Sequence, residues 1–234
     1  MLFSKFSKTV GAGFAFGVLV VTGMLISSPG RAANDNNGPQ DEKLMIQLGF
    51  AVAPVTLKYD NKDADMVGLG SYLVNVAGDC NGCHSAGPQT QYLPGHNPFF
   101  LNQTATVNPA TYLGGGNDFG MISAPPSPHI ISRNLTPDKT GLPEGHTLAQ
   151  FIQIFRTGAD LDHEHPNCSV TRTTNCFPLG AGLPPFNGDL LQVMPWPAFK
   201  SFTDRQIEAI YLYLKAVPCI QGGEPDEPAG RCGA

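Results

Sequence analysis

The chain has 234 residues and a formal net charge of -5, from 14 basic and 19 acidic residues. Only 14% of the residues are charged and 41% are hydrophobic, which argues against a disordered chain, and the lack of a basic run argues against nucleic-acid binding. The 27 Gly and 21 Pro residues argue against a coiled coil and favour one domain with long loops.

Residues 1–32 have the features of a secretory signal peptide. Lys5 and Lys8 precede an uncharged apolar stretch over residues 10–26, and small residues follow around Gly30 to Ala33, with Gly30-Arg31-Ala32 as a plausible cleavage site. We therefore expect cleavage near Ala33 and export to the periplasm. An uncleaved membrane anchor is the alternative, because the apolar stretch is nearly long enough to span a bilayer.

The rest of the chain divides into three predicted parts. Residues 33–64 are expected to form a polar leader, whose apolar patch at 44–57, interrupted by Pro54, should lie against the following domain. That domain is expected to span residues 65–218, with a C-terminal tail at 219–234.

Three segments of the predicted domain carry apolar residues at the spacing of one helix face. The three sets are Leu69, Tyr72, Leu73 and Val76; Leu148, Phe151, Ile152 and Phe155; and Ile207, Ile210, Tyr211 and Leu214. No segment shows the alternation typical of strands, so the sequence predicts a mainly α fold with long loops.

Two of these helices also have start and stop signals. Thr147 and Thr203 each precede a glutamine by three residues, which fits the capping box, and Gly158 and Pro218 mark the helix ends. The long loop over residues 85–142 is rich in Gly, Pro and Asn and is expected to cover a cofactor. We interpret its Gly114-Gly115-Gly116 run as a flexible turn, because the Lys-Ser/Thr pair of a phosphate-binding loop is missing.

The segment Cys80-Asn81-Gly82-Cys83-His84 has the spacing of a haem c attachment site. In such a site the two thiols add across the haem vinyl groups as thioethers, and the histidine binds the iron. A redox dithiol or half of a zinc site are the alternatives. The first lacks its strand–helix context and the second lacks another ligand pair. The sequence therefore predicts one covalently bound haem c.

The ligand on the other face of the iron decides the function of such a protein. Met194 is our candidate, because Pro195 and Pro197 stiffen its loop just ahead of the last helix. Met121 is the reserve candidate, and Met45 and Met66 precede the haem motif. A thioether ligand closes the sixth position and gives an electron carrier, whereas an open position permits ligand binding or peroxide chemistry.

Together with the haem motif, residues 70–74 (GSYLV), 133–138 (RNLTPD) and 194–197 (MPWP) resemble bacterial monohaem c-type cytochromes of the class I fold. The resemblance extends to the haem domains in cytochrome subunits of membrane-bound alcohol, gluconate and aldehyde dehydrogenases, although those subunits carry several haem motifs. It implies that the first and last helices cross around the haem and that His84 and Met194 are its axial ligands.

Further residues are expected to support the haem. Arg133 lies in the segment 133–138 that carries the resemblance, and on that ground it is predicted to pair with a haem propionate through its bidentate guanidinium. Trp196 is predicted to pack against the porphyrin edge.

Four cysteines remain outside the haem motif. In an oxidising compartment they are expected to form two disulfides. Of the three possible pairings, Cys168 with Cys176 and Cys219 with Cys232 close the shortest loops.

We expect structural roles for one polar cluster and for three histidines elsewhere in the chain. A divalent ion could bind the cluster of Asp160, Asp162, His163, Glu164 and His165, but a solvated loop is the favoured interpretation. Hydrogen-bonding roles in loops are expected for His96, His129 and His146.

These features predict a periplasmic one-electron carrier or cytochrome subunit, and not an enzyme. Its expected partners are redox proteins, such as a dehydrogenase or a terminal oxidase, with a basic patch that matches the acidic chain. Two alternatives stay open at this point. One is a haem enzyme or gas sensor with an open sixth site, and the other is a non-haem binding module with three disulfides.

Overall fold

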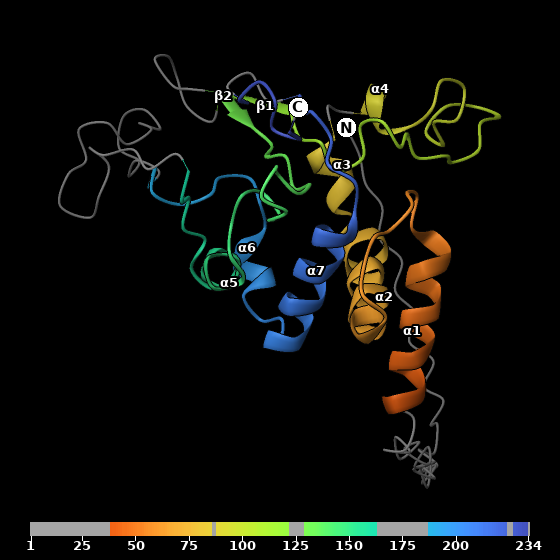
Figure 1. Cartoon of the computed structure of the whole chain (residues 1–234). Helices are drawn as coiled ribbons and strands as arrows, with labels where there is room; N and C mark the ends of the chain where they lie inside the picture. Colours follow the sequence, from red (N-terminus) through yellow and green to blue (C-terminus); the bar gives the residue numbers. More distant parts are fainter. Residues whose placement is uncertain (1–37, 86–87, 122–128, 163–186, 224–226, 234) are drawn as a thin grey trace, which may run out of the picture. The chain divides into compact units, whose positions relative to one another are not determined.

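The computed structural model describes residues 38–85, 88–121, 129–162, 187–223 and 227–233 (Figure 1). The regular elements are α1 (Gly38–Val52), the 3-10 turn η1 (Asn61–Asp63), α2 (Ala64–Tyr72), the π-helical turn η2 (Leu73–Ala77), α3 (Cys80–His84), α4 (Pro88–Gln91), β1 (Asp118–Met121), β2 (His129–Ile131), α5 (Leu148–Thr157), α6 (Trp196–Phe199) and α7 (Asp204–Ala216). Within these ranges, every helix is too short or too polar to cross a membrane.

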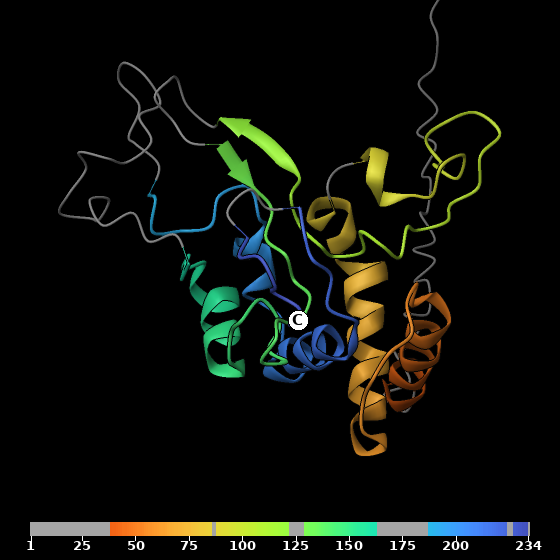
Figure 2. The ribbon, with the colours of Figure 1, turned by 45° about the horizontal axis from the view of Figure 1, so that its top comes forward.

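Helix α2 lies between α1 and α7, as Figures 1 and 2 show from two directions. Glycines allow the close approach on both sides. A Cβ atom on Gly49 would lie 1.9 Å from the carbonyl oxygen of Gly68, and one on Gly70 would lie 1.9 Å from that of Ala209. The Ser71 hydroxyl also donates a 2.7 Å hydrogen bond to the Gly49 carbonyl. Because both sides are covered, α2 is buried over the whole run from Val67 to Ser71 rather than along one stripe.

The two predicted capping boxes are confirmed. At α5 the Thr147 side chain accepts from the backbone N–H of Gln150, and at α7 Thr203 does the same with Gln206. Helix α5 stops at Gly158, which has a left-handed φ of 71°. Helix α7 stops at Ala216, two residues before the predicted proline stop.

The helix before the haem motif departs from the prediction at its end. Leu69 and Leu73 are buried as expected, but Val76 is 49% exposed and Val74 is fully buried instead. The cause is η2, in which the Gly78 N–H donates to the Leu73 carbonyl five residues back. The wider turn changes the angle per residue, so the i, i+7 spacing no longer identifies the buried face.

Helix α1 was not predicted, and the expected lack of strands was wrong for one small sheet. In α1, Met45, Ile46 and Phe50 pack against the core formed by the later helices. The sheet pairs β1 and β2 in antiparallel register, with a bulge between the two paired positions. Strands of four and three residues are too short to show alternation in sequence.

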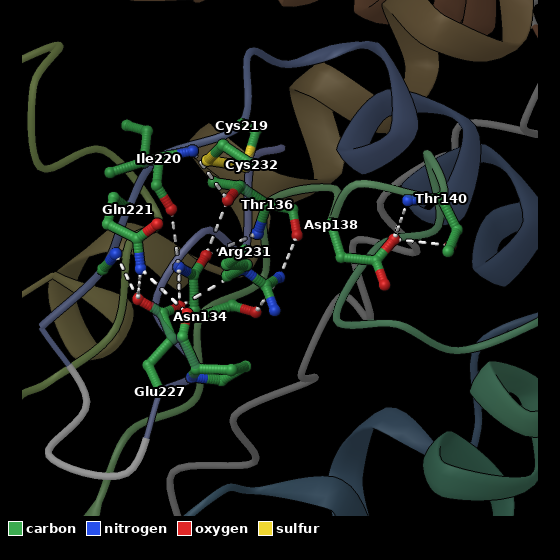
Figure 3. Close-up of a disulfide and its surroundings, with 12 residues drawn as sticks. Asn134, Thr136, Asp138, Thr140, Cys219, Ile220, Gln221, Glu227, Arg231 and Cys232 are labelled. Atoms are coloured by element: carbon green, nitrogen blue, oxygen red, sulfur yellow. Dashed lines mark hydrogen bonds and ion pairs between the residues drawn. A yellow bond between two sulfur atoms is a disulfide. The ribbon is translucent and has the colours of Figure 1, made fainter. Parts of the chain in front are cut away.

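A disulfide joins Cys219 to Cys232 and confirms one of the predicted pairings (Figure 3). The other predicted pair, Cys168 with Cys176, lies outside the described residues.

Beside this disulfide, the C-terminal tail is bonded to the segment that follows β2 (Figure 3). Arg231 forms an ion pair of 3.2 Å with Glu227, and both side chains are nearly buried. Arg231 also donates to the backbone carbonyls of Asn134 and Thr136. The Asn134 amide donates in turn to Glu227 at 2.6 Å and to the Ile220 carbonyl at 2.9 Å.

Candidate functional site

The haem motif forms α3, one helical turn that follows a sharp change of chain direction. The π-helical turn η2 ends at Ala77, and Asp79 then adopts a left-handed φ of 42°. Asn81 is buried, and its side-chain oxygen accepts a 2.9 Å hydrogen bond from the Leu113 N–H. The motif is therefore anchored to the long loop as well as to the helix before it.

Most of the predicted site residues line one cavity of about 330 Å³. Cys80, Cys83 and His84 of α3 line it together with Met194 and Arg133. Most of the remaining wall is apolar and comes from α5, α7 and neighbouring segments, including Leu135, Phe151, Phe155, Ile210 and Leu214. A largely apolar cavity with a few converging polar groups is typical of a cofactor site.

The imidazole of His84 is held in one orientation and one tautomer. Its Nδ1 lies 2.8 Å from the backbone oxygen of Arg133, which can only accept a hydrogen bond, so the proton is on Nδ1. Burial lowers the pKa of His84 and keeps the ring neutral. The Nε2 atom is consequently left with an available lone pair, as a metal ligand requires.

The backbone around His84 is fixed by the glycine run at residues 114–116, a role that differs from the flexible turn expected from the sequence. The Gly115 N–H donates to the His84 carbonyl at 2.6 Å, and the Gly116 N–H donates to the Ser132 carbonyl at 2.8 Å. A Cβ atom on Gly115 would lie 2.5 Å from the backbone of Arg133. A triple glycine can signal close backbone approach as well as flexibility, and here it indicates close approach.

The two cysteines of α3 are free and protonated. Burial raises the pKa of the Cys80 thiol to about 12, with the neighbouring charge of Asp79 adding to the effect. The pKa of Cys83 is also raised, first by burial and then by Asp79. Redox-active dithiols need at least one thiol with a lowered pKa, so this environment argues against the dithiol alternative.

The structure separates the methionine candidates. Met194 is half-buried and lines the cavity, in a tight turn where its N–H donates to the Gln192 carbonyl at 2.8 Å. Met45 and Met66 also pack against the helical core, but neither is part of the cavity wall. The side chain of Met121 lies outside what the structure describes.

Arg133 and Trp196 are both engaged with other parts of the chain. Arg133 lines the cavity and binds Asp160 through Nη2, at 2.9 and 3.2 Å from the two carboxylate oxygens. Trp196 packs on Gly158, where an added Cβ would lie 2.2 Å from the indole ring, and it is not part of the cavity wall. Their predicted contacts with a propionate and a porphyrin edge remain predictions.

The described part of the cluster at residues 160–165, for which a solvated loop was favoured over a metal site, forms ion pairs. Asp160 binds Arg133, and Asp162 lies 3.3 Å from the Nε2 atom of His146. Residues 163–165 of the cluster lie outside the described residues. Among the residues that are described, no group of three or more His, Cys, Asp or Glu side chains is placed to hold a metal ion.

All three histidines have polar contacts of the predicted kind, but the expected loop position was wrong for His129, which begins β2. His129 contacts Asp118 at 2.7 Å, and His96 contacts the Thr106 hydroxyl at 3.0 Å. His146 is paired with Asp162 as described above.

Comparison with known proteins points to cytochromes. The chain is similar to a fructose dehydrogenase cytochrome subunit from Gluconobacter japonicus, with 26% identity over 148 residues. The similar region covers 63% of this chain and 20% of that protein, so the chain spans about a fifth of its relative's length. No family model matches the chain, and no solved structure does. The similarity thus supports, at a coarse level, a cytochrome subunit of a dehydrogenase.

Proposed function

We propose that this protein is a periplasmic electron-transfer cytochrome of the class I fold, carrying one covalently attached haem c. In this proposal Cys80 and Cys83 would hold the haem through thioether links, and His84 and Met194 would bind its iron. One observation carries the proposal: two free thiols, an imidazole with an available Nε2 and a thioether share one largely apolar cavity.

The donor set of the cavity fits the group. Thioether links form from thiols, and the raised pKa of Cys80 keeps its sulfur protonated. The Arg133 carbonyl presents the Nε2 atom of His84 as a ligand. When bound, the haem supplies an iron that exchanges one electron between its ferric and ferrous states. The apolar walls exclude water, which favours the less charged ferrous state and raises the reduction potential.

Two further residues are proposed to act on the haem from this cavity or beside it. Arg133 is the one Lys or Arg among the described residues of the wall, which makes it the natural partner for a propionate. Trp196 holds the start of α6 against Gly158, directly after the Met194-Pro195 turn. We propose that it acts on the haem by fixing this turn as well as by its apolar ring.

We propose that the redox partner is a dehydrogenase or a terminal oxidase. The proposal of a dehydrogenase partner is based on the similarity of this chain to a dehydrogenase cytochrome subunit. The acidic chain favours a basic docking surface on the partner, and electron exchange should slow as salt is added.

The first test is covalent haem after production with haem-maturation machinery. The parent protein should keep its haem on denaturation, and a variant with Cys80→Ala and Cys83→Ala should lose it. A colourless parent protein would contradict the proposal and would return the chain to the class of non-haem binding modules.

The second test separates an electron carrier from a haem enzyme or gas sensor. The reduced parent should show Met-to-iron absorption and should not bind carbon monoxide, whereas Met194→Ala should lose the band and bind the gas. Met66→Leu is the matched control, because Met66 packs against the helical core and is not part of the cavity wall. Carbon monoxide binding by the parent would favour the open-site alternative.

A further inference from the structure

The loop after α4 carries the most exposed apolar side chains of the described chain. Phe99 is 80% exposed, Phe100 61% and Leu101 89%, and the three are consecutive in sequence. In Figures 1 and 2 this yellow-green loop extends away from the helices. Large contiguous apolar groups on a protein surface usually mark an interaction site.

The base of this loop is closed by backbone bonding. Tyr92 and Val107 form an isolated antiparallel bridge, and the Leu93 N–H donates to the Thr106 carbonyl at 2.9 Å. The Thr106 N–H also donates to the His96 carbonyl, so the two arms of the loop are joined to each other.

The tip itself is shaped by internal hydrogen bonds. The Asn97 side chain accepts from the Phe99 N–H at 3.0 Å, and the Gln103 side chain accepts from the Asn97 N–H at 2.8 Å. The ring of Phe99 also meets that of Tyr92 edge-on, with centroids 6.4 Å apart. The apolar tip is therefore presented by an organised loop, which reduces the entropy lost when it binds.

The loop lies in the middle of a long uncharged stretch. Residues 80–117 contain no Asp, Glu, Lys or Arg, although the chain as a whole has an excess of acidic residues. Burying a charge in an apolar phase is costly, and a negative surface is repelled by anionic lipids. The uncharged loop avoids both costs.

We infer that residues 98–102 insert into the interface of a lipid bilayer and hold the protein at a membrane surface. A projecting tip of two phenylalanines and a leucine, flanked by Asn, Gln and Thr, matches the graded polarity of a bilayer interface. A protein partner is usually oriented by complementary charges, and this loop has none. None of its residues lines the cavity, so membrane contact leaves the candidate haem site accessible.

The experiment measures binding of the full-length protein to vesicles of zwitterionic phosphatidylcholine. Phe99→Ser, Phe100→Ser and Leu101→Ser are combined in one variant, which should bind about tenfold more weakly or worse than the parent. Leu44→Ser with Leu48→Ser is the matched control, because these leucines are exposed on α1 at 54% and 43% and their loss should leave binding unchanged.

Hydrogen exchange of backbone amides shows which residues contact the vesicle, and so distinguishes binding through the loop tip from binding through another part of the chain. Vesicles should protect the amides of residues 99–102 in the parent but not in the triple variant, whatever else holds the chain to lipid. Equal protection with and without vesicles would overturn the inference. Protection caused by a dehydrogenase subunit and not by vesicles would also overturn it, since the tip would then be a protein-docking site. Loss or retention of haem does not change these outcomes.

Discussion

Gly70→Ala tests the close contact between α2 and α7, the helix that lines the cavity through Ile210 and Leu214. An added Cβ at this position would lie 1.9 Å from the Ala209 carbonyl oxygen and 2.7 Å from the Cβ of Tyr213. Real Cβ atoms essentially never approach other heavy atoms within 3.0 Å. Because the obstacle is backbone, the two helices would have to separate by about 1 Å.

The size of the effect follows from two opposing contributions. Overpacking a tight contact costs about 1–3 kcal/mol, and a rigid backbone obstacle places this change at the upper end. Alanine has a helix propensity about 1 kcal/mol better than glycine, which offsets part of the cost. We therefore expect a net loss of about 2 kcal/mol, or a fall in Tm of about 4–8 °C.

Thermal and urea unfolding of the holoprotein, followed by circular dichroism, measure this loss. Gly38→Ala is the matched control, because nothing lies within 4 Å of a Cβ atom built on Gly38, at the start of α1. It should leave the free energy of unfolding unchanged within about 0.5 kcal/mol. If Gly70→Ala were as stable as Gly38→Ala, that result would contradict the close contact between α2 and α7.

Three further changes test other parts of the structure. Replacing Cys219 and Cys232 by serine removes a link between residues 13 apart. The free energy of unfolding, measured by urea denaturation without reductant, should fall by about 3 kcal/mol. A loss near zero would mean that the polar contacts alone hold the tail. Thr203→Ala removes the side chain that caps α7 and should cost about 1 kcal/mol in the same assay, and an unchanged midpoint would contradict the capping role. The hydrogen bond to Asp162 is the main reason that the pKa of His146 lies above 6.5, so the stability from this pair is present below pH 6.5 and lost as pH rises through the folded-state pKa. His146→Asn should flatten that part of the pH–stability curve, and an unaltered curve would show that the pair does not contribute.

The features predicted correctly depend on local chemistry. The caps at Thr147 and Thr203 need only a hydroxyl and a glutamine one turn later, and both form. The pairing of Cys219 with Cys232 depends on a short loop closure, which sequence separation measures directly. The segment from Cys80 to His84 forms one helical turn, and its role in haem attachment stays a prediction.

The features that were missed depend on tertiary packing. Val76 is exposed because it lies in a π-helical turn, whereas the apolar spacing used for the prediction holds only for a regular α-helix. Helix α1 buries Ile46 and Phe50 against α2 but leaves Leu44 exposed, so its hydrophobic pattern does not show a clean face. The role of Gly115 requires knowing which backbone segment it approaches.

The orientation of His84 shows how far the haem motif alone determines the site. Its Nδ1 partner is the carbonyl of Arg133, 49 residues away in sequence. That carbonyl is held from one side by the glycine run, through Gly116 and Ser132, and from the other by Asn134, which the disulfide-linked tail binds. In the proposed site the motif would supply the attachment chemistry, whereas the direction of the His84 Nε2 atom depends on the long loop and the C-terminal tail. Changes in the tail should consequently affect the spectrum of the holoprotein before they affect attachment of the haem.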